Sequence, residues 1–267
     1  MEITSLQNPK IKKVVKLRKR KERDESSLFL IEGYRELSRA HLKGVEIVEL
    51  FTCPDLFLKT NEKKLIDQIG CKNTYTCTKG VFEKISYRDR PDGLLAVAKQ
   101  KRLDLSYLEK VIKNLKNPFF LVAESIEKPG NLGSILRSAD GVKVDAVIVC
   151  DACTDIFNPN VVRASVGTLF TQPVIETTTE KLIAFLKKEK IKIASATPHA
   201  DKIYTEMDLT GPLAIIVGSE QYGLSKKWMT LCDSKMKIPM KGIADSLNVS
   251  AATTLLLYEV LRQRNAK

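Results

Sequence analysis

Short apolar runs alternate with amphipathic helical patterns along most of the chain. Runs such as Leu28–Ile31 predict β-strands, and stretches whose apolar residues recur every three or four positions predict helices. In the first part of the chain the predicted strands are 28–31, 45–51, 74–76 and 94–98, and the predicted helices are 33–42, 62–69 and 79–85. This alternation predicts a small α/β domain.

The alternation restarts after a polar, basic stretch at 99–117. From there the predicted strands are 119–122, 146–149, 174–175, 192–196, 213–217 and 236–238, and the predicted helices are 132–139, 161–169, 179–188, one from 225 and one from about 248 to 264. Continuous apolar strands of this kind are typical of a parallel sheet covered by helices on both faces. We therefore predict two α/β domains, at 1–100 and 118–267, joined by a linker at 101–117.

The segment 8–25 combines a narrow apolar stripe with many cations. Its pattern predicts a helix that buries residues such as Ile11 and Val14 and presents a basic face. The whole chain has a net charge of +12, with 44 Lys and Arg against 32 Asp and Glu. Clustered positive charge favours a polyanionic partner. We predict that the following residues contact RNA: Lys12, Lys13, Lys16, Arg18, Lys19 and Arg20. The alternative is a solvated helix that packs on its own domain.

No apolar stretch approaches the ~18 residues that a membrane-spanning helix needs. The polar start of the chain has no apolar signal region, so we expect a cytoplasmic protein with reduced cysteines. Cys150 and Cys153 have C-x-x-C spacing, but no second pair follows at zinc-ribbon spacing and the two histidines are distant in sequence. We therefore predict no metal site, and we place Cys150 at the buried end of a strand.

Three segments of the second half, 131–137, 217–224 and 238–250, carry glycines between an apolar run and a helical pattern. In α/β proteins such turns at strand ends collect ligand-binding residues. The second segment is not G-x-G-x-x-G, and no acidic residue follows about twenty positions later, so a dinucleotide site is disfavoured. Gly218 is predicted to let a ligand approach the backbone at the end of strand 213–217.

In this order and spacing the three segments resemble motifs 1, 2 and 3 of the SpoU/TrmH family of RNA ribose 2′-O-methyltransferases. The resemblance implies a SPOUT α/β domain with a trefoil knot in the second half. More loosely, it implies an L30e-like α/β domain in the first half, where Phe29–Arg35 matches best. It also implies S-adenosylmethionine as the cofactor, a homodimer, and a ribose 2′-OH of structured RNA as the acceptor. Ribosomal RNA is favoured over transfer RNA because L30e-like domains resemble proteins that bind ribosomal RNA.

The resemblance also implies roles for individual residues. The candidate catalytic residues are Asn131, Arg137, Arg163, Glu220, Ser246 and Asn248, and the candidate cofactor-binding residues are Gly218, Ile238, Met240 and Leu247. Glu220 is implied to be a buried group that holds the first motif, and Lys128 stands where the family usually has an acidic residue. The plainer interpretations are an ordinary helix arginine for Arg137 and Arg163, a solvated acid for Glu220, and a helix cap for Asn248.

The role of Arg137 follows from the chemistry of its guanidinium. A guanidinium stays protonated at neutral pH and is therefore a poor base. We therefore expect Arg137 to orient the hydroxyl and stabilise the developing alkoxide, with removal of the hydroxyl proton as the alternative. A SPOUT base methyltransferase would lack the third motif. Two other functions remain open from the sequence: a transfer-RNA 2′-O-methyltransferase, and a non-catalytic RNA-binding or ribosome-assembly protein on the same scaffold. The last of these predicts decay of the motif side chains, which are all present.

Overall fold

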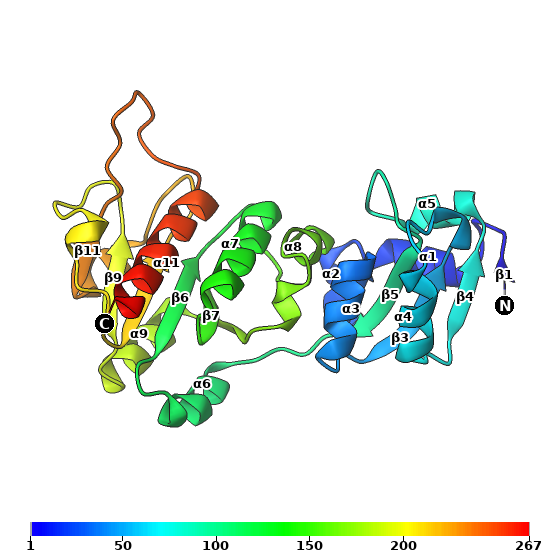
Figure 1. Cartoon of the computed structure of the whole chain (residues 1–267), viewed down its shortest axis with the longest axis horizontal. Helices are drawn as coiled ribbons and strands as arrows, with labels where there is room; N and C mark the ends of the chain where they lie inside the picture. The colour runs from blue at the N-terminus through cyan, green and yellow to red at the C-terminus, as the bar shows by residue number, and fades with distance from the viewer. Residues whose placement is uncertain (1, 267) are drawn as a thin grey trace. The chain divides into compact units, whose positions relative to one another are not determined.

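The computed structural model describes residues 2–266; residues 1 and 267, the outer ends of the two predicted domains, lie outside the described residues. By their contacts the residues form two compact units (Figure 1). Unit 1 comprises the chain up to Lys101 together with Asp155–Thr171, and unit 2 comprises Arg102–Thr154 and the chain from Gln172 onward. Unit 1 therefore draws on two separate stretches of the sequence.

The segment Asp155–Thr171 belongs to unit 1 through a buried ion pair and aromatic packing. Arg23 Nε and Nη2 lie 2.8 and 2.7 Å from Asp155 Oδ2, and both side chains are 1% exposed. The ring of Phe29 lies 4.7 Å from that of Phe157 and 5.9 Å from that of Phe170, between centroids. The boundaries expected from sequence place this segment in the second domain. Hydrophobic periodicity could not show the difference, because a helix gives the same pattern in either unit.

Unit 1 contains a mixed five-stranded sheet with the order β1-β4-β3-β5-β2. Its strands are β1 (Glu2–Ile3), β2 (Leu28–Glu32), β3 (Ile47–Thr52), β4 (Thr74–Cys77) and β5 (Leu94–Lys99). β4 is parallel to β1 and β3, whereas β5 is antiparallel to β2 and β3. The four strands expected in this part of the chain are confirmed to within two residues. The two-residue β1 was not expected, because so short a strand leaves no periodicity to detect.

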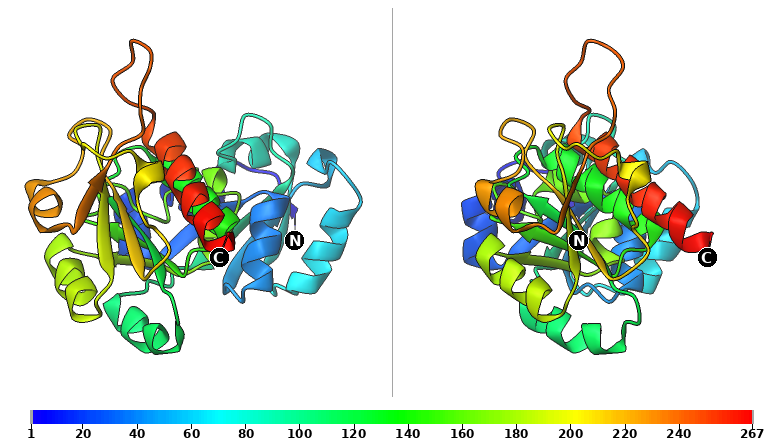
Figure 2. Two further views of the ribbon diagram at one scale, coloured as in Figure 1. Left: turned by 60° about the vertical axis from the view of Figure 1, so that its left-hand side comes forward. Right: turned by 90° about the vertical axis from the view of Figure 1, so that its left-hand side faces the viewer.

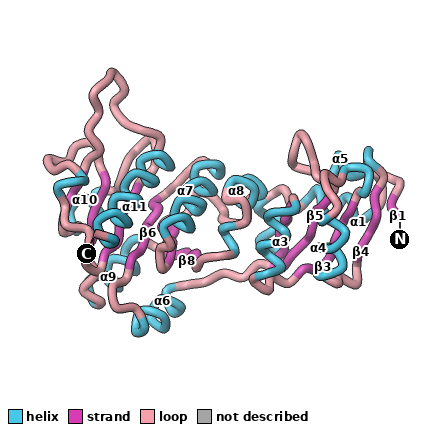
Figure 3. The backbone as a smooth tube through the Cα atoms, viewed as in Figure 1, coloured by secondary structure: helices cyan, strands magenta, loops and turns pink. Residues whose placement is uncertain are grey.

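The helices of unit 1 cover this sheet (Figure 3). They are α1 (Pro9–Lys16), α2 (Arg20–Ser26), α3 (Tyr34–Leu42), α4 (Asn61–Ile69), α5 (Lys79–Ile85) and α8 (Pro159–Ala164), with 3₁₀ turns η1 (Pro54–Leu56) and η3 (Thr168–Phe170). The single helix expected at 8–25 is therefore two helices. Arg23 explains the break: its Nη1 donates to the carbonyls of Leu17 and Arg18 at 2.9 and 2.8 Å, which satisfies acceptors left free where α1 ends.

Unit 2 is built on a six-stranded sheet in which every pair of neighbours is parallel, with the order β11-β9-β10-β6-β7-β8. Its strands are β6 (Phe119–Glu124), β7 (Ala146–Cys150), β8 (Val174–Thr177), β9 (Lys192–Ala196), β10 (Leu213–Val217) and β11 (Ser234–Met236). Every residue of β6, β7 and β10 is buried, as expected for a parallel sheet covered on both faces. The mixed α/β class with parallel strands is confirmed.

The helices of unit 2 are α6 (Leu105–Val111), α7 (Pro129–Val142), α9 (Thr179–Lys188), α10 (Lys226–Leu231) and α11 (Val249–Asn265), with 3₁₀ turns η2 (Ile112–Asn114) and η4 (Tyr204–Glu206). α7 and α11 lie side by side, as both views in Figure 2 show. The hydroxyls of Ser138 and Thr254 join them by a hydrogen bond of 2.7 Å. The helix that contains the first glycine segment and the helix that follows the third are therefore neighbours, although more than a hundred residues separate them.

The expectation for Cys150 is confirmed: it is fully buried at the end of β7, and burial raises the pKa of its thiol. Cys153 is exposed. Across residues 2–266 no three His, Cys, Asp or Glu side chains are grouped as metal ligands would be. None of the helices within that range is both long and apolar enough to span a membrane.

Candidate functional site

The carboxyl ends of the parallel strands in unit 2 carry a cavity of about 580 Å³, here called the carboxyl-edge cavity. Its walls come from the loops after β9, β10 and β11, which meet because their strands run in the same direction in one sheet. The loop that precedes α11, orange in Figure 1, extends beyond the strand ends. Its residues from Lys241 to Asn248 are all exposed.

Seven of the ten candidate catalytic and cofactor-binding residues line this cavity. They are Gly218, Glu220, Ile238, Met240, Ser246, Leu247 and Asn248. The four candidate cofactor-binding residues are all among them. Three loops that are distant in sequence therefore bring the second and third glycine segments to one place. Asn131 joins them through hydrogen bonds described next, whereas Arg137 and Arg163 lie elsewhere.

Asn131, Glu220 and Asn248 form a polar network at the carboxyl-edge cavity. Asn131 Nδ2 donates a hydrogen bond to Glu220 Oε1, and Asn248 Nδ2 donates to Asn131 Oδ1 at 3.2 Å. Asn248 Oδ1 in turn accepts from the backbone N–H and the hydroxyl of Ser250 at 2.9 and 2.7 Å, which caps α11. Capping and network formation are therefore done by the same amide. Glu220 is exposed, so the buried position implied by the resemblance is wrong, while its hold on the first motif is present.

Gly218 is required by the loop in which it lies. The backbone N–H of Ser219 donates to Gly223 O at 3.1 Å, and the N–H of Gly223 donates to Ser219 O at 3.0 Å. A Cβ on Gly218 would lie 2.3 Å from Gly223 O and 2.5 Å from its carbonyl carbon. The sequence suggested that a ligand needs this space. The structure shows that the loop's own backbone already fills it.

Arg137 is exposed on α7 and does not line the carboxyl-edge cavity. It follows Asn131 by six helical positions, which places the two side chains about 120° apart around the helix axis. Within residues 2–266 it has no hydrogen bond or ion pair with the polar network. Its guanidinium is therefore available to a partner outside the chain.

Arg163 lies in unit 1, on the exposed side of α8. It lines a second cavity of about 730 Å³ that is formed entirely by unit 1 residues. The sequence grouped Arg163 with the catalytic candidates because the segment 158–167 resembles a family segment in which an arginine approaches the active site. In the structure Arg163 instead lines a cavity together with residues of α3, α4 and the segment 88–92.

The six predicted RNA-contacting residues lie in α1, in α2 and in the turn between them. Some of them face solvent, and others bond to groups of their own chain. Lys12, Lys16 and Lys19 are exposed. Arg18 Nη2 donates to the carbonyls of Lys84 and Ser86 at 2.8 and 2.6 Å. Two weaker ion pairs involve the remaining cations, Lys13 with Glu49 at 3.9 Å and Arg20 with Asp24 at 3.5 Å. Both interpretations of this segment therefore hold in part: Arg18 fastens it to its own domain, and its lysines face solvent.

Sequence reasoning missed several residues of the carboxyl-edge cavity, notably Thr197, His199, Met236 and, as a lining residue, Lys128. Thr197 and His199 follow β9, which pairs with β10. The sequence pattern that marks them is a strand followed by a loop, and every strand of this sheet has that pattern. Only the strand order shows that β9 ends beside Gly218.

The carboxyl-edge cavity lies where open parallel α/β sheets generally bind their ligands, at the carboxyl ends of the strands. Residues 118–258 match the sequence model of the SpoU rRNA Methylase family, and residues 8–96 match that of the MRM3-like substrate binding domain. The chain belongs to the SpoU rRNA methylase family.

Relatives of known activity resemble this chain over most of its length. The 23S rRNA (guanosine(2553)-2′-O)-methyltransferase RlmP of Bacillus subtilis (strain 168) is 29% identical over 97% of this chain and 98% of its own. The 23S rRNA (uridine(2479)-2′-O)-methyltransferase of Streptomyces viridochromogenes is 30% identical over 88% of this chain and 76% of its own.

Solved structures of other proteins have the same fold as this chain. An RNA 2′-O ribose methyltransferase superposes with a TM-score of 0.85 at 36% identity, covering 99% of this chain and 100% of the other. The SpoU methyltransferase AviRb from Streptomyces viridochromogenes, in complex with the cofactor AdoMet, superposes with a TM-score of 0.87 at 27% identity, covering 97% and 100%.

Proposed function

We propose that the protein transfers a methyl group from S-adenosylmethionine to a ribose 2′-OH of structured RNA, with ribosomal RNA as the substrate class. The observation that carries this proposal is the carboxyl-edge cavity with its polar network, in a chain of the SpoU rRNA methylase family. Relatives that act on 23S rRNA align along nearly the whole chain, which favours ribosomal over transfer RNA.

The residues of the carboxyl-edge cavity fit S-adenosylmethionine. Its volume of about 580 Å³ lies within the usual range for small-molecule sites. Ile238, Met240 and Leu247 supply apolar surface for an adenosyl group, and the loop from Gly218 to Leu224 supplies backbone polar groups. When bound, this cofactor supplies a methyl group on a positively charged sulfur, which an oxygen nucleophile can attack in line.

The chain's own residues would position the acceptor hydroxyl and manage its charge. We propose that the Glu220 carboxylate and Asn248 fix the Asn131 amide, so that the network holds one geometry at the mouth of the cavity. Ser246 lines the same mouth and can hydrogen-bond the ribose. For Arg137, the exposed and unpaired guanidinium supports a role in holding the RNA backbone and stabilising the alkoxide as the hydroxyl loses its proton. Arg163 is proposed as an RNA contact in unit 1, not as part of this set.

We propose further that unit 2 is a SPOUT domain with a trefoil knot and that the first domain is L30e-like. Along the sequence the proposed domains are 1–100 and 118–267 with a linker at 101–117, and the segment 155–171 of the second packs with unit 1. The return of α11 to lie beside α7 supports a knotted C-terminus. A homodimer is proposed as well. Leu255 and Tyr258, three positions apart on α11, are 42% and 50% exposed and offer an apolar stripe to a second copy. A cytoplasmic location without a metal completes the proposal, because the ribosomal substrate is there and the proposed chemistry requires no metal.

Methyl transfer from labelled S-adenosylmethionine to purified RNAs tests this function. Ribosomal RNA transcripts should accept label, and transfer RNA should accept far less. Preferential labelling of transfer RNA would select the tRNA methyltransferase. Cofactor binding without transfer to any RNA would favour the non-catalytic RNA-binding protein.

A further inference from the structure

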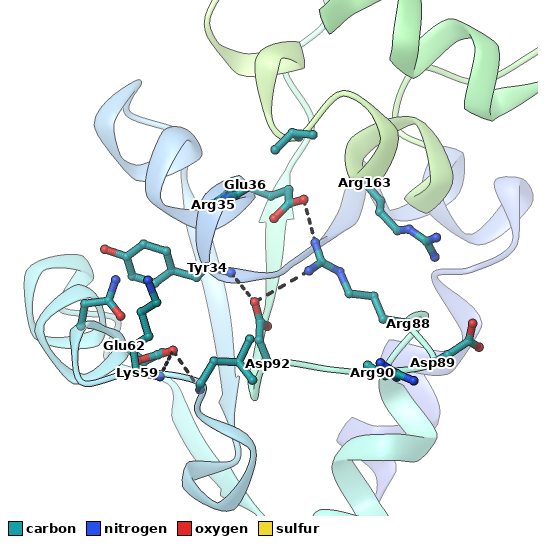
Figure 4. Close-up of a pocket in the computed structure, with 13 residues that line it drawn as sticks. Tyr34, Arg35, Glu36, Lys59, Glu62, Arg88, Asp89, Arg90, Asp92 and Arg163 are labelled. Atoms are coloured by element: carbon teal, nitrogen blue, oxygen red, sulfur yellow. Dashed lines mark hydrogen bonds and ion pairs between the residues drawn. The ribbon is translucent and has the colours of Figure 1, made fainter.

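The second cavity, here called the unit 1 cavity, is lined mainly by charged side chains (Figure 4). Four exposed cations line it: Arg35, Lys59, Arg90 and Arg163. Three acids that line it are almost fully buried: Glu36 at 4%, Glu62 at 2% and Asp92 at 6% exposure. Buried carboxylates beside exposed cations are costly to build unless something fixes them or uses them.

Some of these charged side chains hold the walls of the cavity in place. Arg88 Nη2 lies 2.7 Å from Glu36 Oε1 and donates to Glu32 O at 2.9 Å, while its Nη1 lies 3.7 Å from Asp92 Oδ2. Asp92 Oδ2 also accepts from the N–H of Tyr34 at 2.8 Å, at the start of α3. Gly33 has φ +106°, and a Cβ there would lie 2.3 Å from Arg88 Nη2. The glycine therefore leaves room for an arginine that ties α3 to the segment 88–92.

Two carboxylate oxygens are left over from this arrangement. Glu62 Oε1 accepts from the backbone N–H groups of Leu58 and Lys59, both at 3.1 Å. Glu62 Oε2 and Asp92 Oδ1 have no hydrogen-bond partner within the described chain. Among the other residues that line the cavity, the acceptor Asn61 Oδ1 and the donor Arg88 Nε have none either. A buried acceptor without a donor costs free energy, so these oxygens point to a ligand that brings N–H groups.

We infer that the unit 1 cavity binds one unpaired guanine nucleotide of the RNA substrate, with its base donors on Glu62 and Asp92 and its phosphates on the surrounding cations. This inference rests on the proposed function for RNA as the substrate. The cations Arg35, Arg90 and Arg163 are free to pair with phosphate oxygens, and Tyr34 and the 75% exposed Leu58 offer surface to a base. The site is distinct from the carboxyl-edge cavity, since every residue that lines it belongs to unit 1.

The choice of guanine follows from the acceptor character of the cavity. Guanine places an N1–H and an exocyclic N–H side by side on its Watson–Crick edge. Adenine and cytosine have one amino group beside an acceptor nitrogen, and uracil has one N–H between two carbonyl oxygens. Carboxylate oxygens repel those acceptors, so two free carboxylate oxygens favour the base with two adjacent donors.

Fluorescence anisotropy with labelled RNA pentanucleotides tests the inference without methyl transfer. The full-length protein should bind AAGAA about tenfold more tightly than AAUAA, as expected for one well-placed pair of base contacts. Glu62→Gln keeps the acceptor for the N–H groups of Leu58 and Lys59 and turns the free oxygen into a donor. It should therefore abolish the preference. Glu83→Gln, an exposed acid on α5 that does not line the cavity, is the control and should retain it.

A second pair of variants, one at the cavity and one control, tests the cations. Lys59→Gln should weaken binding of both pentanucleotides and lower the slope of log K against log salt by about 0.7. Lys63→Gln, on α4 and exposed but outside the cavity lining, should leave the slope unchanged. Thermal unfolding of each variant checks that the fold is intact.

Equal affinity of the unaltered protein for AAGAA and AAUAA would overturn the inference, whatever the variants do. A preference that survives in folded Glu62→Gln would overturn it too. Methyl transfer to ribosomal RNA, measured on the same preparations, separates the two claims. Transfer without a guanine preference removes only this inference, and a preference without transfer removes the proposed function.

Discussion

The carboxyl-edge cavity of unit 2 and the unit 1 cavity offer ligands opposite kinds of surface. The first is walled by loop backbone and apolar side chains such as Ile238 and Leu247, with one polar network at its edge. The second is walled by arginines and buried carboxylates. The first suits a small cofactor held by shape and backbone, and the second suits a polyanion read by charge and hydrogen bonding. On the proposed function, unit 2 would carry out the chemistry and unit 1 would recognise the RNA.

Removing the Arg137 guanidinium tests the chemical half of this comparison most severely. Arg137→Ala should lower single-turnover methyl transfer by ~10² or more, because a cation that stabilises the alkoxide is lost. Affinity for S-adenosylmethionine should stay within a few-fold, since Arg137 does not line the carboxyl-edge cavity. Arg137→Lys should rescue poorly, because an ammonium lacks the planar fork.

Lys187→Ala, an exposed cation on α9, is the matched control for Arg137→Ala and should not change the rate. A rate near that of the unaltered protein in Arg137→Ala would return Arg137 to an ordinary surface arginine.

Substitution of Gly218 tests whether the carboxyl-edge cavity depends on its own backbone. Gly218→Ala and Gly218→Val should both weaken S-adenosylmethionine binding by about tenfold or more, because the first Cβ already collides with Gly223. Calorimetry with Gly211→Ala, where a Cβ meets nothing within 4 Å, gives the control. A loss that appears only with valine would restore the view that ligand, rather than loop, needs the space.

Weakening the polar network should have a smaller effect. Glu220→Gln keeps an oxygen that can accept from Asn131, but a neutral amide accepts a weaker hydrogen bond than a carboxylate does. Methyl transfer should fall by about tenfold with little change in cofactor affinity. Glu109→Gln, at an exposed acid on α6, is the control and should leave the rate of methyl transfer unchanged in the same single-turnover assay. An unchanged rate in Glu220→Gln would make Glu220 a solvated loop acid.

The smallest effect is expected on the recognition side, from the basic segment of α1 and α2. Replacing Lys12, Lys16 and Lys19 by Gln should reduce the slope of log K against log salt for RNA binding by about 0.7 to 0.9 per lost phosphate contact. Arg18→Gln should lower thermal stability instead, because its guanidinium is bonded to the carbonyls of Lys84 and Ser86. A salt slope unaffected by the triple change would show that this surface does not meet RNA.

The carboxyl-edge cavity was largely predictable from sequence and the unit 1 cavity was not, for physical reasons. Gly218 follows an apolar strand, so its position can be inferred from the pattern of the sequence. Ile238 and Asn248 lie in one continuous segment, and it is the resemblance of that segment to a family motif that implied their roles. Glu62, Asp92 and Arg163 are single charged residues in three separate segments, and only the fold brings them together. Residues 155–171 were expected in the second domain for the same reason: the partner of Asp155 is Arg23, 132 positions away.

Local conformation set a further limit on the prediction. The helix expected at 8–25 was interrupted by Arg23, whose tertiary hydrogen bonds do not show in a periodicity. Gly218 lines the cavity, and the structure adds a reason for this glycine that the sequence could not give, because the return of the loop to Gly223 depends on backbone geometry. Element types were therefore well predicted, and their contacts were not.

Alkaline hydrolysis of ribosomal RNA labelled by the protein from methyl-labelled S-adenosylmethionine tests the central claim most directly. Alkali cleaves RNA by attack of the 2′-oxygen on the adjacent phosphate, so a methylated 2′-oxygen leaves an uncut dinucleotide. The account predicts that label is recovered in alkali-stable dinucleotides and that Arg137→Ala lowers the initial rate at which this dinucleotide label accumulates about a hundredfold. Label recovered in mononucleotides would place the methyl group on a base and contradict the account.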